Sequence, residues 1–303
     1  MPRGLANIRH LPWLLAELIR SGPRTARIET ELGRLQAVEQ RTARLEGLIE
    51  HELSPMLGAL VREDAENRRR LHRMRASPQY EDPFTDPDPL VSVLLPTQSR
   101  PHLLKTRSLP SILSQSHSRL EVLVVGDHAG PETAEAVKEI GDQRVVYRNL
   151  TQRFLVSEDS ERHWLAAGSM ARNEAMRTAR GQWLISFDDD DEMRPGHVET
   201  LLGHAREHQL EVAYGQCCDH RPGVPSEVHG AFPPRPLEFA WQAAIRHAGL
   251  RFFEGELVTA ALGIPGDWFT LERMLRAGVR FGHVEQVVYD YYPAKVRRRP
   301  DGP

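Results

Sequence analysis

The chain has 303 residues, of which 40% are hydrophobic and 27% charged, and its 39 Lys and Arg nearly balance its 42 Asp and Glu, giving a formal net charge of −3. This composition excludes a wholly disordered or collagen-like chain, and the charge balance argues against a dedicated nucleic-acid-binding protein. The two cysteines, Cys217 and Cys218, are adjacent, which argues against a disulfide framework and a structural zinc site and fits a reducing, cytoplasmic location.

Residues 1–76 are predicted to form a helical or coiled-coil region distinct from the rest of the chain. Apolar residues recur at spacings of three or four between Arg24 and Arg75, and the other faces are Glu, Arg and Gln. Ser54 and Pro55 are predicted to break this pattern and to start a second helix. Because a narrow apolar stripe cannot be buried by one helix alone, we expect it to pair with a partner helix or with a second copy of the chain.

Two further segments raise the question of membrane contact. An apolar stretch, 11–19, is flanked by arginines, and a basic group occupies residues 295–299. The stretch is too short to span a bilayer, so its alternatives are peripheral contact with the inner membrane face or an ordinary packed helix.

Residues 77–89 carry four prolines and four acidic residues, which predicts an extended linker to a domain over residues 90–303. In that domain apolar runs alternate with helical patterns, as in a mainly parallel α/β sheet with helices on both faces. Strands are expected at 90–95, 120–125, 144–147, 182–187, 210–214 and 279–291, and helices at 103–115, 132–140, 163–179, 195–208, 237–248 and 267–277. A donor-binding half, 90–216, would precede an acceptor half, 217–303.

Polar side chains follow three of the predicted strands. Thr97 and Arg100 come after the first, Asp127 comes after the second, and four consecutive aspartates, Asp188–Asp191, come after the strand at 182–187. Because ligands of open parallel sheets bind beyond the carboxyl ends of the strands, we expect these side chains to line one site.

The four aspartates repel one another unless they are solvated or bind a cation. If the strand continues through them, Asp188 and Asp190 project to one side, and Asp189 and Asp191 to the other. Such a pair of carboxylates suits Mg²⁺ or Mn²⁺, whose coordination shell is completed by water and phosphate oxygens. The alternative is a solvated acidic loop. No GxGxxG or Walker A sequence accompanies the strands, so a metal rather than a glycine cradle would hold the phosphates.

Three segments, in this order, resemble the motifs of family-2 glycosyltransferases with the GT-A fold: VSVLLPTQSRPHLL, LEVLVVGDHAG and ARNEAMRTARGQWLISFDDDDEMRPGHVETL. The resemblance covers residues 90–215 strongly and 266–292 more weakly, and the first 78 residues lie outside it. It implies a GT-A fold and transfer of a sugar from a nucleotide-diphospho-sugar donor to an acceptor hydroxyl on a glycan, a lipid-linked sugar or a small molecule.

The resemblance also implies roles for individual residues. Asp188 and Asp190 would hold Mn²⁺ or Mg²⁺, and Asp267 would be the catalytic base of an inverting reaction. Gly126 and Gly266 stand where many members of the family have acidic residues. The residues implied to bind the donor are Pro96, Thr97, Arg100, Asp127, Arg172, Asn173, Asp188 and Asp189.

Two other functions compete with this interpretation. A sugar-phosphate nucleotidyltransferase also uses an α/β nucleotide fold and Mg²⁺, but it usually carries a glycine-rich loop after the first strand, and the PTQSRP segment lacks glycine. A coiled-coil assembly protein with a degenerate transferase domain is the second alternative, and the intact aspartate cluster together with Asp267 argues against it.

Overall fold

The computed structural model describes residues 24–48, 50–51, 54–153, 165–236, 238–255 and 263–293. The chain divides into one unit up to Glu63 and a second from Asp64. The apolar stretch 11–19 and the basic group 295–299 lie outside the described residues, so membrane contact through them stays a prediction. Among the helices that the structure describes, none has both the length and the hydropathy needed to cross a bilayer.

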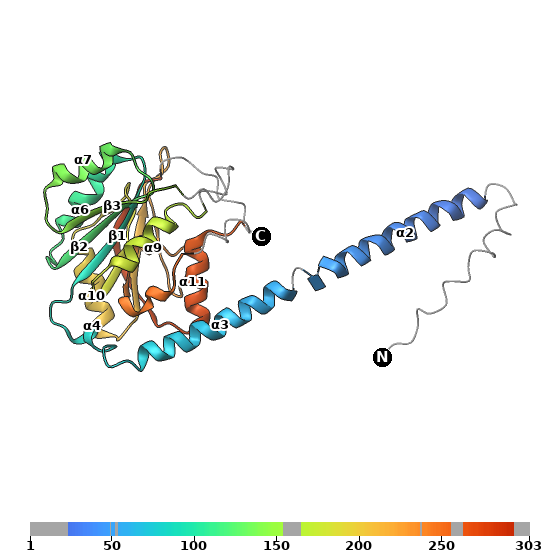
Figure 1. The fold of residues 1–303 in the computed structure, drawn as a ribbon, viewed down its shortest axis with the longest axis horizontal. Coiled ribbons are helices and arrows are strands. Elements are labelled where there is room, and N and C mark those ends of the chain that lie inside the picture. The colour runs from blue at the N-terminus through green and yellow to red at the C-terminus, as the bar shows by residue number, and fades with distance from the viewer. Residues whose placement is uncertain are drawn as a thin grey trace. The chain divides into compact units, whose positions relative to one another are not determined.

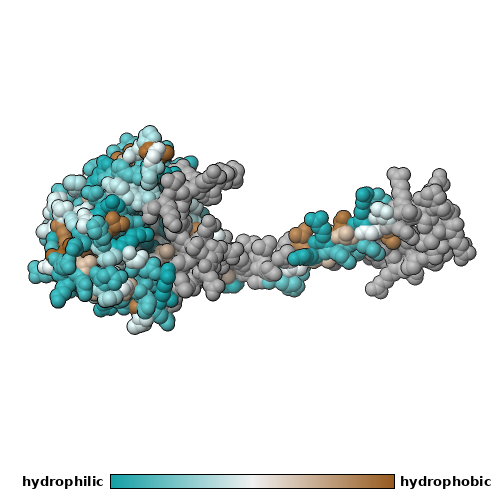
Figure 2. Space-filling model, turned by 90° about the horizontal axis from the view of Figure 1, so that it is seen from above, coloured by the Kyte–Doolittle hydropathy of each residue, from teal (hydrophilic) through white to brown (hydrophobic). Residues whose placement is uncertain are grey.

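The N-terminal region is helical where its apolar periodicity predicts helix. Helix α2 spans Arg24–Leu48, and α3 spans Ser54–Arg75, beginning at the serine expected to start it. Along α2 the apolar side chains of Leu35, Val38 and Leu45 are exposed, at 66%, 60% and 59% (Figure 2). Their stripe is uncovered in the single chain, and its pairing with a second copy stays a prediction.

The second unit is built round a nine-stranded mixed sheet (Figure 1). Its order is β3-β2-β1-β4-β8-β6-β9-β5, and β7 pairs with β6. Strands β1 to β4 run parallel, β8 runs antiparallel to both β4 and β6, and β6 and β9 are parallel. The strands are β1 (Val91–Thr97), β2 (Leu120–Gly126), β3 (Val145–Asn149), β4 (Trp183–Ser186), β5 (Glu192–Met193), β6 (Val212–Asp219), β7 (Glu227–His229), β8 (Ala244–His247) and β9 (Phe281–Tyr291).

Helices cover both faces of this sheet, as the continuous apolar runs of β1 and β2 require. Alternate residues of β1 enter different core clusters: Val93 and Leu95 pack with α6, α7 and α10, whereas Leu94 packs with α9 on the opposite face. The remaining helical segments are α4 (Asp82–Thr85), α5 (Pro101–Leu103), a π-helical turn (Leu104–Ser108), α6 (Leu109–Leu113), α7 (Pro131–Ile140), α9 (Ser169–Thr178), α10 (His197–Glu207), η4 (Trp241–Ala243), η5 (Ala248–Phe252) and α11 (Gly266–Ala277).

Two segments differ from their predicted structure. The segment 237–248, predicted as a helix, holds the short 3₁₀ turn η4 and then strand β8, because hydrogen bonds to β4 and β6 outweigh its local helical pattern. The segment predicted as an extended linker packs on the sheet instead. Its Phe84 lies 5.4 Å from Trp183 between ring centroids, and the Trp183 indole donates to the Pro83 carbonyl (3.0 Å).

A buried carboxylate joins the end of α3 to the start of β6. Glu211 is fully buried, and both of its oxygens accept hydrogen bonds from Arg75, each at 2.7 Å. It also accepts from the Tyr80 hydroxyl (2.9 Å) and the Arg280 backbone N–H (2.9 Å). Burial alone would raise the pKa of Glu211, but these hydrogen bonds outweigh burial and lower the pKa below its usual range.

We expect Glu211→Gln to destabilise the protein by about 3 kcal/mol, because it leaves the Arg75 guanidinium without its buried partner. The lowered pKa means that the carboxylate stabilises the fold above pH 4.5, and that this contribution disappears as the pH falls through the folded-state pKa. Urea unfolding at pH 7 and pH 4 measures both effects, and the variant should lose less stability on acidification than the wild type. The matched control is Glu66→Gln, in an exposed ion-pair network, which should leave stability close to that of the wild type.

A candidate active site at the carboxyl edge of the sheet

The ends of β1 and β2 form one wall of the site. Pro96 lies in β1 opposite Val125, beyond the point where β4 stops pairing, so its missing N–H leaves the ladder to β4 intact. The Asp127 N–H donates to the Thr97 carbonyl (2.8 Å), which ties the two strand ends together. Asp127 is buried, and its Oδ1 has no hydrogen-bond partner among the described residues, so one acceptor is left for a ligand.

The glycine before Asp127 has a structural cause. A Cβ on Gly126 would lie 2.5 Å from the Asn149 Oδ1 and 3.0 Å from the Ala129 Cβ. The Asn149 amide is held in place, since it bonds both the N–H and the carbonyl of Ala129. The chain therefore cannot carry here the acidic residue that is common in the family it resembles.

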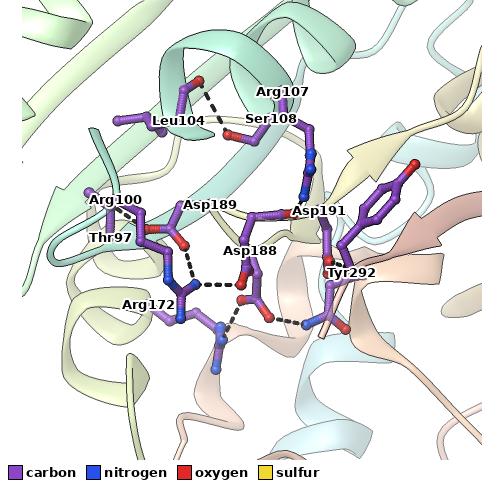
Figure 3. Close-up of polar contacts among 12 residues, drawn as sticks. Thr97, Arg100, Leu104, Arg107, Ser108, Arg172, Asp188, Asp189, Asp191 and Tyr292 are labelled. Carbon is purple, nitrogen blue, oxygen red and sulfur yellow. Dashed lines mark hydrogen bonds and ion pairs between the residues drawn. The ribbon is translucent and has the colours of Figure 1, made fainter. Parts of the chain in front are cut away.

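The four aspartates lie in a turn and not on a strand, because β4 ends at Ser186. The two-residue alternation of a strand therefore does not decide which way these side chains point, and each aspartate contacts different residues. Figure 3 shows Asp188, Asp189 and Asp191 turned in different directions. The Asp188 carboxylate meets Arg172 and Gln242, and the Asp191 carboxylate accepts from the Tyr292 N–H (3.0 Å).

Asp189 is buried and links the acidic cluster to the loop after β1. Its two oxygens accept from the Thr97 hydroxyl (2.6 Å) and the Arg100 guanidinium (2.7 Å). The same Arg100 nitrogen also lies 2.7 Å from the Asp190 Oδ2. The structure thus brings Thr97, Arg100 and the acidic cluster together, as predicted for a shared site. Both oxygens of Asp189 are already hydrogen-bonded to the loop after β1.

Asp188 is the most accessible of these carboxylates. The exposed fraction of its side chain is 32%, against 14% for Asp190 and 7% for Asp189. One of its oxygens lies 3.3 Å from the Arg172 guanidinium, and the other accepts from the Gln242 amide. Gln242, on η4, was not among the predicted site residues, because its segment was expected to be an ordinary helix.

The cluster carries more negative charge than its surroundings neutralise. Burial, with help from Asp188 and Asp189 and against the attraction of Arg100, raises the pKa of Asp190 to about 6. Burial also raises the pKa of Asp191 strongly, and the Asp191 Oδ2 has no partner among the described residues. Oxygen ligands from carboxylates and an unsatisfied negative charge fit a hard divalent cation such as Mg²⁺ or Mn²⁺.

Two residues outside the predicted set, Arg107 and Tyr292, also contact the acidic cluster. The Arg107 guanidinium donates to the Asp190 carbonyl (2.6 Å) and lies 4.1 Å from the centre of the Tyr292 ring. Arg107 comes from the π-helical turn after β1, and Tyr292 directly follows β9. Neither position carries a local sequence signal, since their meeting depends on the path of β9.

A small hollow of about 30 Å³, open at its mouth, lies beside the cluster. Side chains from α9, η4, β8 and α11 line it, among them Arg172, Asn173, Arg246 and Asp267. The Asn173 amide is engaged with both backbone polar groups of Gly255, at 2.9 Å each. Asn173 therefore fixes a wall of the hollow, and its predicted contact with a donor stays a prediction.

Asp267 lies in the first turn of α11, at the rim of this hollow. Solvent reaches the residue, yet the surrounding protein desolvates its carboxyl and raises the pKa. Its Oδ1 accepts from the Trp268 N–H (2.9 Å), and its carbonyl accepts from the Trp241 indole (3.0 Å). A carboxylate that is positioned by a hydrogen bond, is accessible to solvent and has a raised pKa can accept a proton from a bound hydroxyl.

A second group of possible metal ligands lies at the carboxyl ends of β6 and β9. Cys218, His220 and Asp290 offer ligand atoms that lie within 4.8 Å of one another. Both oxygens of Asp290, however, already accept from the Arg194 guanidinium at 2.7 Å. An ion there would have to displace a bidentate arginine, whereas the aspartate cluster keeps the buried Asp191 Oδ2 without a partner among the described residues, so the cluster is the better candidate cation site.

The fold and this site define a class. A mixed sheet whose parallel strands end in an acidic cluster, with a further carboxylate across an adjoining hollow, is the arrangement of GT-A glycosyltransferases, and solved glycosyltransferases share the fold. The family model for glycosyl transferase family 2 matches residues 92–259, more than half of the chain. The chain belongs to that family, and its second unit is a transferase domain.

Individual relatives are more distant. The chain is 28% identical over 137 residues to the GalNAc(5)-diNAcBac-PP-undecaprenol beta-1,3-glucosyltransferase of Campylobacter jejuni, covering 45% of this chain and 40% of that protein. It resembles S. aureus TarS 1–349 in complex with UDP-GlcNAc (TM-score 0.52, 18% identity, 69% and 60% of the two chains). It also resembles the mannosyltransferase PcManGT of Pyrobaculum calidifontis in complex with GDP-Man and Mn²⁺ (TM-score 0.51, 17% identity, 77% and 66%). The chain spans about 40% of the length of the first curated relatives.

Proposed function

We propose that this chain transfers a sugar from a nucleoside-diphosphate donor to an acceptor hydroxyl, with a divalent cation and with inversion at the anomeric carbon. The observation that carries the proposal is the meeting of the β1 loop, through Thr97 and Arg100, with the aspartates after β4. Asp267 lies across the adjoining hollow from this cluster. Membership of glycosyl transferase family 2 supports it and weighs against the nucleotidyltransferase and assembly-protein alternatives.

The donor would lie along the carboxyl edge of β1, β2 and β4. The unpartnered Oδ1 of Asp127 suits an N–H of the nucleotide base, and Asp188 and Asp190 would hold Mn²⁺ or Mg²⁺. The bound cation would offset the charge that develops on the leaving diphosphate. Arg100 and Arg172 hold the carboxylates in position, and contacts to the remote nucleoside orient the reacting carbon.

Asp267 would act as the base. Its carboxylate accepts the proton of the acceptor hydroxyl as that oxygen attacks the anomeric carbon and the bond to the diphosphate breaks. A single base on one side, with the leaving group on the other, supports one in-line displacement and hence inversion.

The acceptor is proposed to be a glycan or a lipid-linked sugar. The name of the C. jejuni relative describes an acceptor attached to undecaprenol through a diphosphate. A lipid-linked acceptor would bring the chain to the inner face of a membrane, which accords with the predicted surface contact of residues 11–19.

The test is a screen of nucleotide sugars with and without Mn²⁺, which measures release of the nucleoside diphosphate and thermal stabilisation of the protein. We expect at least one donor to be bound and slowly hydrolysed with Mn²⁺, and Asp190→Ala to lose both responses. Release of pyrophosphate from a nucleoside triphosphate and a sugar phosphate would favour the nucleotidyltransferase. If the wild type binds no nucleotide sugar, the enzymatic proposal fails and the assembly-protein alternative gains.

A further inference from the structure

A buried arginine in the wall of the hollow has no carboxylate partner among the residues that the structure describes. Arg246 lies on β8, in register with Leu184 of β4 and Val212 of β6, and only 5% of it is exposed. Its hydrogen bond runs from Nη2 to the Met176 Sδ (2.9 Å), and its guanidinium lies 5.5 Å from the centre of the Trp241 ring. Its Nε, buried as well, has no hydrogen-bond partner in the described part of the chain.

Among the described residues, no neighbouring anion balances the charge of Arg246. Arg172 and Arg251, both cations, act on it, and burial together with their repulsion lowers its pKa to about 10, so it is still charged at neutral pH. A buried guanidinium is strongly unfavourable unless an anion pairs with it. The protein therefore keeps a buried positive charge in the wall of a hollow that opens to solvent.

Arg172 supplies a second donor to the same hollow. Its Nη2 lies 3.3 Å from Asp188, but its buried Nε has no partner among the described residues. Two guanidinium groups, one from α9 and one from β8, thus line one hollow with unused N–H donors. Planar forked donors of this kind match the oxygens of a carboxylate or of a phosphate. Because the cation is proposed to hold the donor diphosphate, a carboxylate is the anion left for these two arginines.

The place of this hollow decides which molecule carries the anion. The hollow adjoins Asp188, proposed to hold the donor diphosphate through a cation, and has Asp267, the proposed base, at its rim. If the proposed function is right, the transferred sugar lies between these two groups. Because Arg172 links the hollow to Asp188, the donor side is favoured over the acceptor side.

We propose that the hollow binds the carboxylate of a uronic acid, and that this uronic acid is the sugar of the nucleotide donor. The inference rests on the proposed glycosyltransferase function and narrows its substrate class. The sugar carboxylate would pair with Arg246 and with the free Nε of Arg172.

The experiment compares donors that differ only in a carboxylate in place of a hydroxymethyl group: UDP-glucuronic acid with UDP-glucose, and GDP-mannuronic acid with GDP-mannose. For nucleoside-diphosphate release with Mn²⁺, we expect the wild type to favour the acidic member of one pair by about 10- to 100-fold in kcat/KM, the range of a charge-assisted hydrogen bond. Arg246→Met should bring this ratio close to 1 and leave the melting temperature of the ligand-free protein unchanged or higher, because an apolar side chain replaces an unpaired buried charge. Arg246→Lys should restore part of the preference.

The matched control is Arg251→Met. Arg251 is an arginine of η5 whose guanidinium donates to the carbonyls of Ala248 and Ala179 and which does not line the hollow. Its removal takes away only a repulsion on Arg246 and should leave the acidic donor preferred. A wild type that uses the neutral donors as well as the acidic ones would overturn the inference and leave the proposed function standing. A ratio that survives in Arg246→Met, or a lower melting temperature with no change in ratio, would show a structural role for Arg246.

Two further outcomes show whether the donor assignment or the proposed function is wrong. A preference for uronic acid acceptors combined with a neutral donor would move the carboxylate to the acceptor and overturn the donor assignment. If none of the four donors is bound or hydrolysed, this inference falls, and the wider screen of nucleotide sugars decides the proposed function. Should Arg246→Met fail to fold, the wild-type preference and the Arg246→Lys ratio decide.

Discussion

Asp267→Asn is expected to lower the rate of sugar transfer by about 10²- to 10⁴-fold, the contribution usual for a positioned general base. Asparagine has the same shape and its side-chain oxygen can still accept the Trp268 N–H, so the first turn of α11 should be preserved. What the variant loses is the ability to take a proton from the acceptor hydroxyl. The measurement is kcat for transfer, alongside thermal stabilisation by the donor with Mn²⁺, which should stay close to the wild-type value.

The control for this variant is Asp142→Asn, an aspartate before β3 whose partner is Arg144, at the opposite end of the strands. It removes one carboxylate without touching the hollow and should leave transfer unchanged. Transfer by Asp267→Asn within a fewfold of the wild type would mean that the base lies elsewhere. Product stereochemistry read by proton NMR adds an independent check, because retention at the anomeric carbon would contradict the role of Asp267 as the only base.

Those parts of the fold that depend on local pattern could be predicted from the sequence. The apolar runs of β1 and β2, the start of α3 at Ser54 and the placing of polar residues after strand ends all follow from short-range chemistry. The family resemblance is confirmed by the match over residues 92–259. Pro96, however, was expected to end the first strand and instead lies within β1, where no neighbour needs its missing N–H.

The rest depends on contacts between distant segments, which local patterns do not encode. The local pattern of β8 predicts a helix, and only its pairing with β4 and β6 makes it a strand. Gln242 and Arg246 were therefore not predicted as site residues. The alternation of Ile245 and Arg246 between the two faces of the sheet is a strand signal that could have found Arg246, whereas Gln242, on η4, has none. Likewise, Phe84 in the proline-rich segment gains its burial from Trp183, about a hundred residues away.

Asp188→Asn and Asp190→Asn should each lower donor turnover by about 10²-fold or more, because each removes a carboxylate proposed to hold the cation that stabilises the leaving diphosphate.

The sharper measurement is thermal stability. Ligand-free Asp190→Asn is expected to be as stable as the wild type or more stable, since it relieves repulsion with Asp188, Asp189 and Asp191 while Arg100 keeps Asp189 as a partner. Stabilisation by a nucleoside diphosphate with Mn²⁺ should be lost in the same variant, because a ligand raises the melting temperature only in proportion to its binding. A variant that keeps the full Mn²⁺-dependent stabilisation would show that the cation binds elsewhere, whereas a variant destabilised without ligand would show that Asp190 is a structural brace like Asp189.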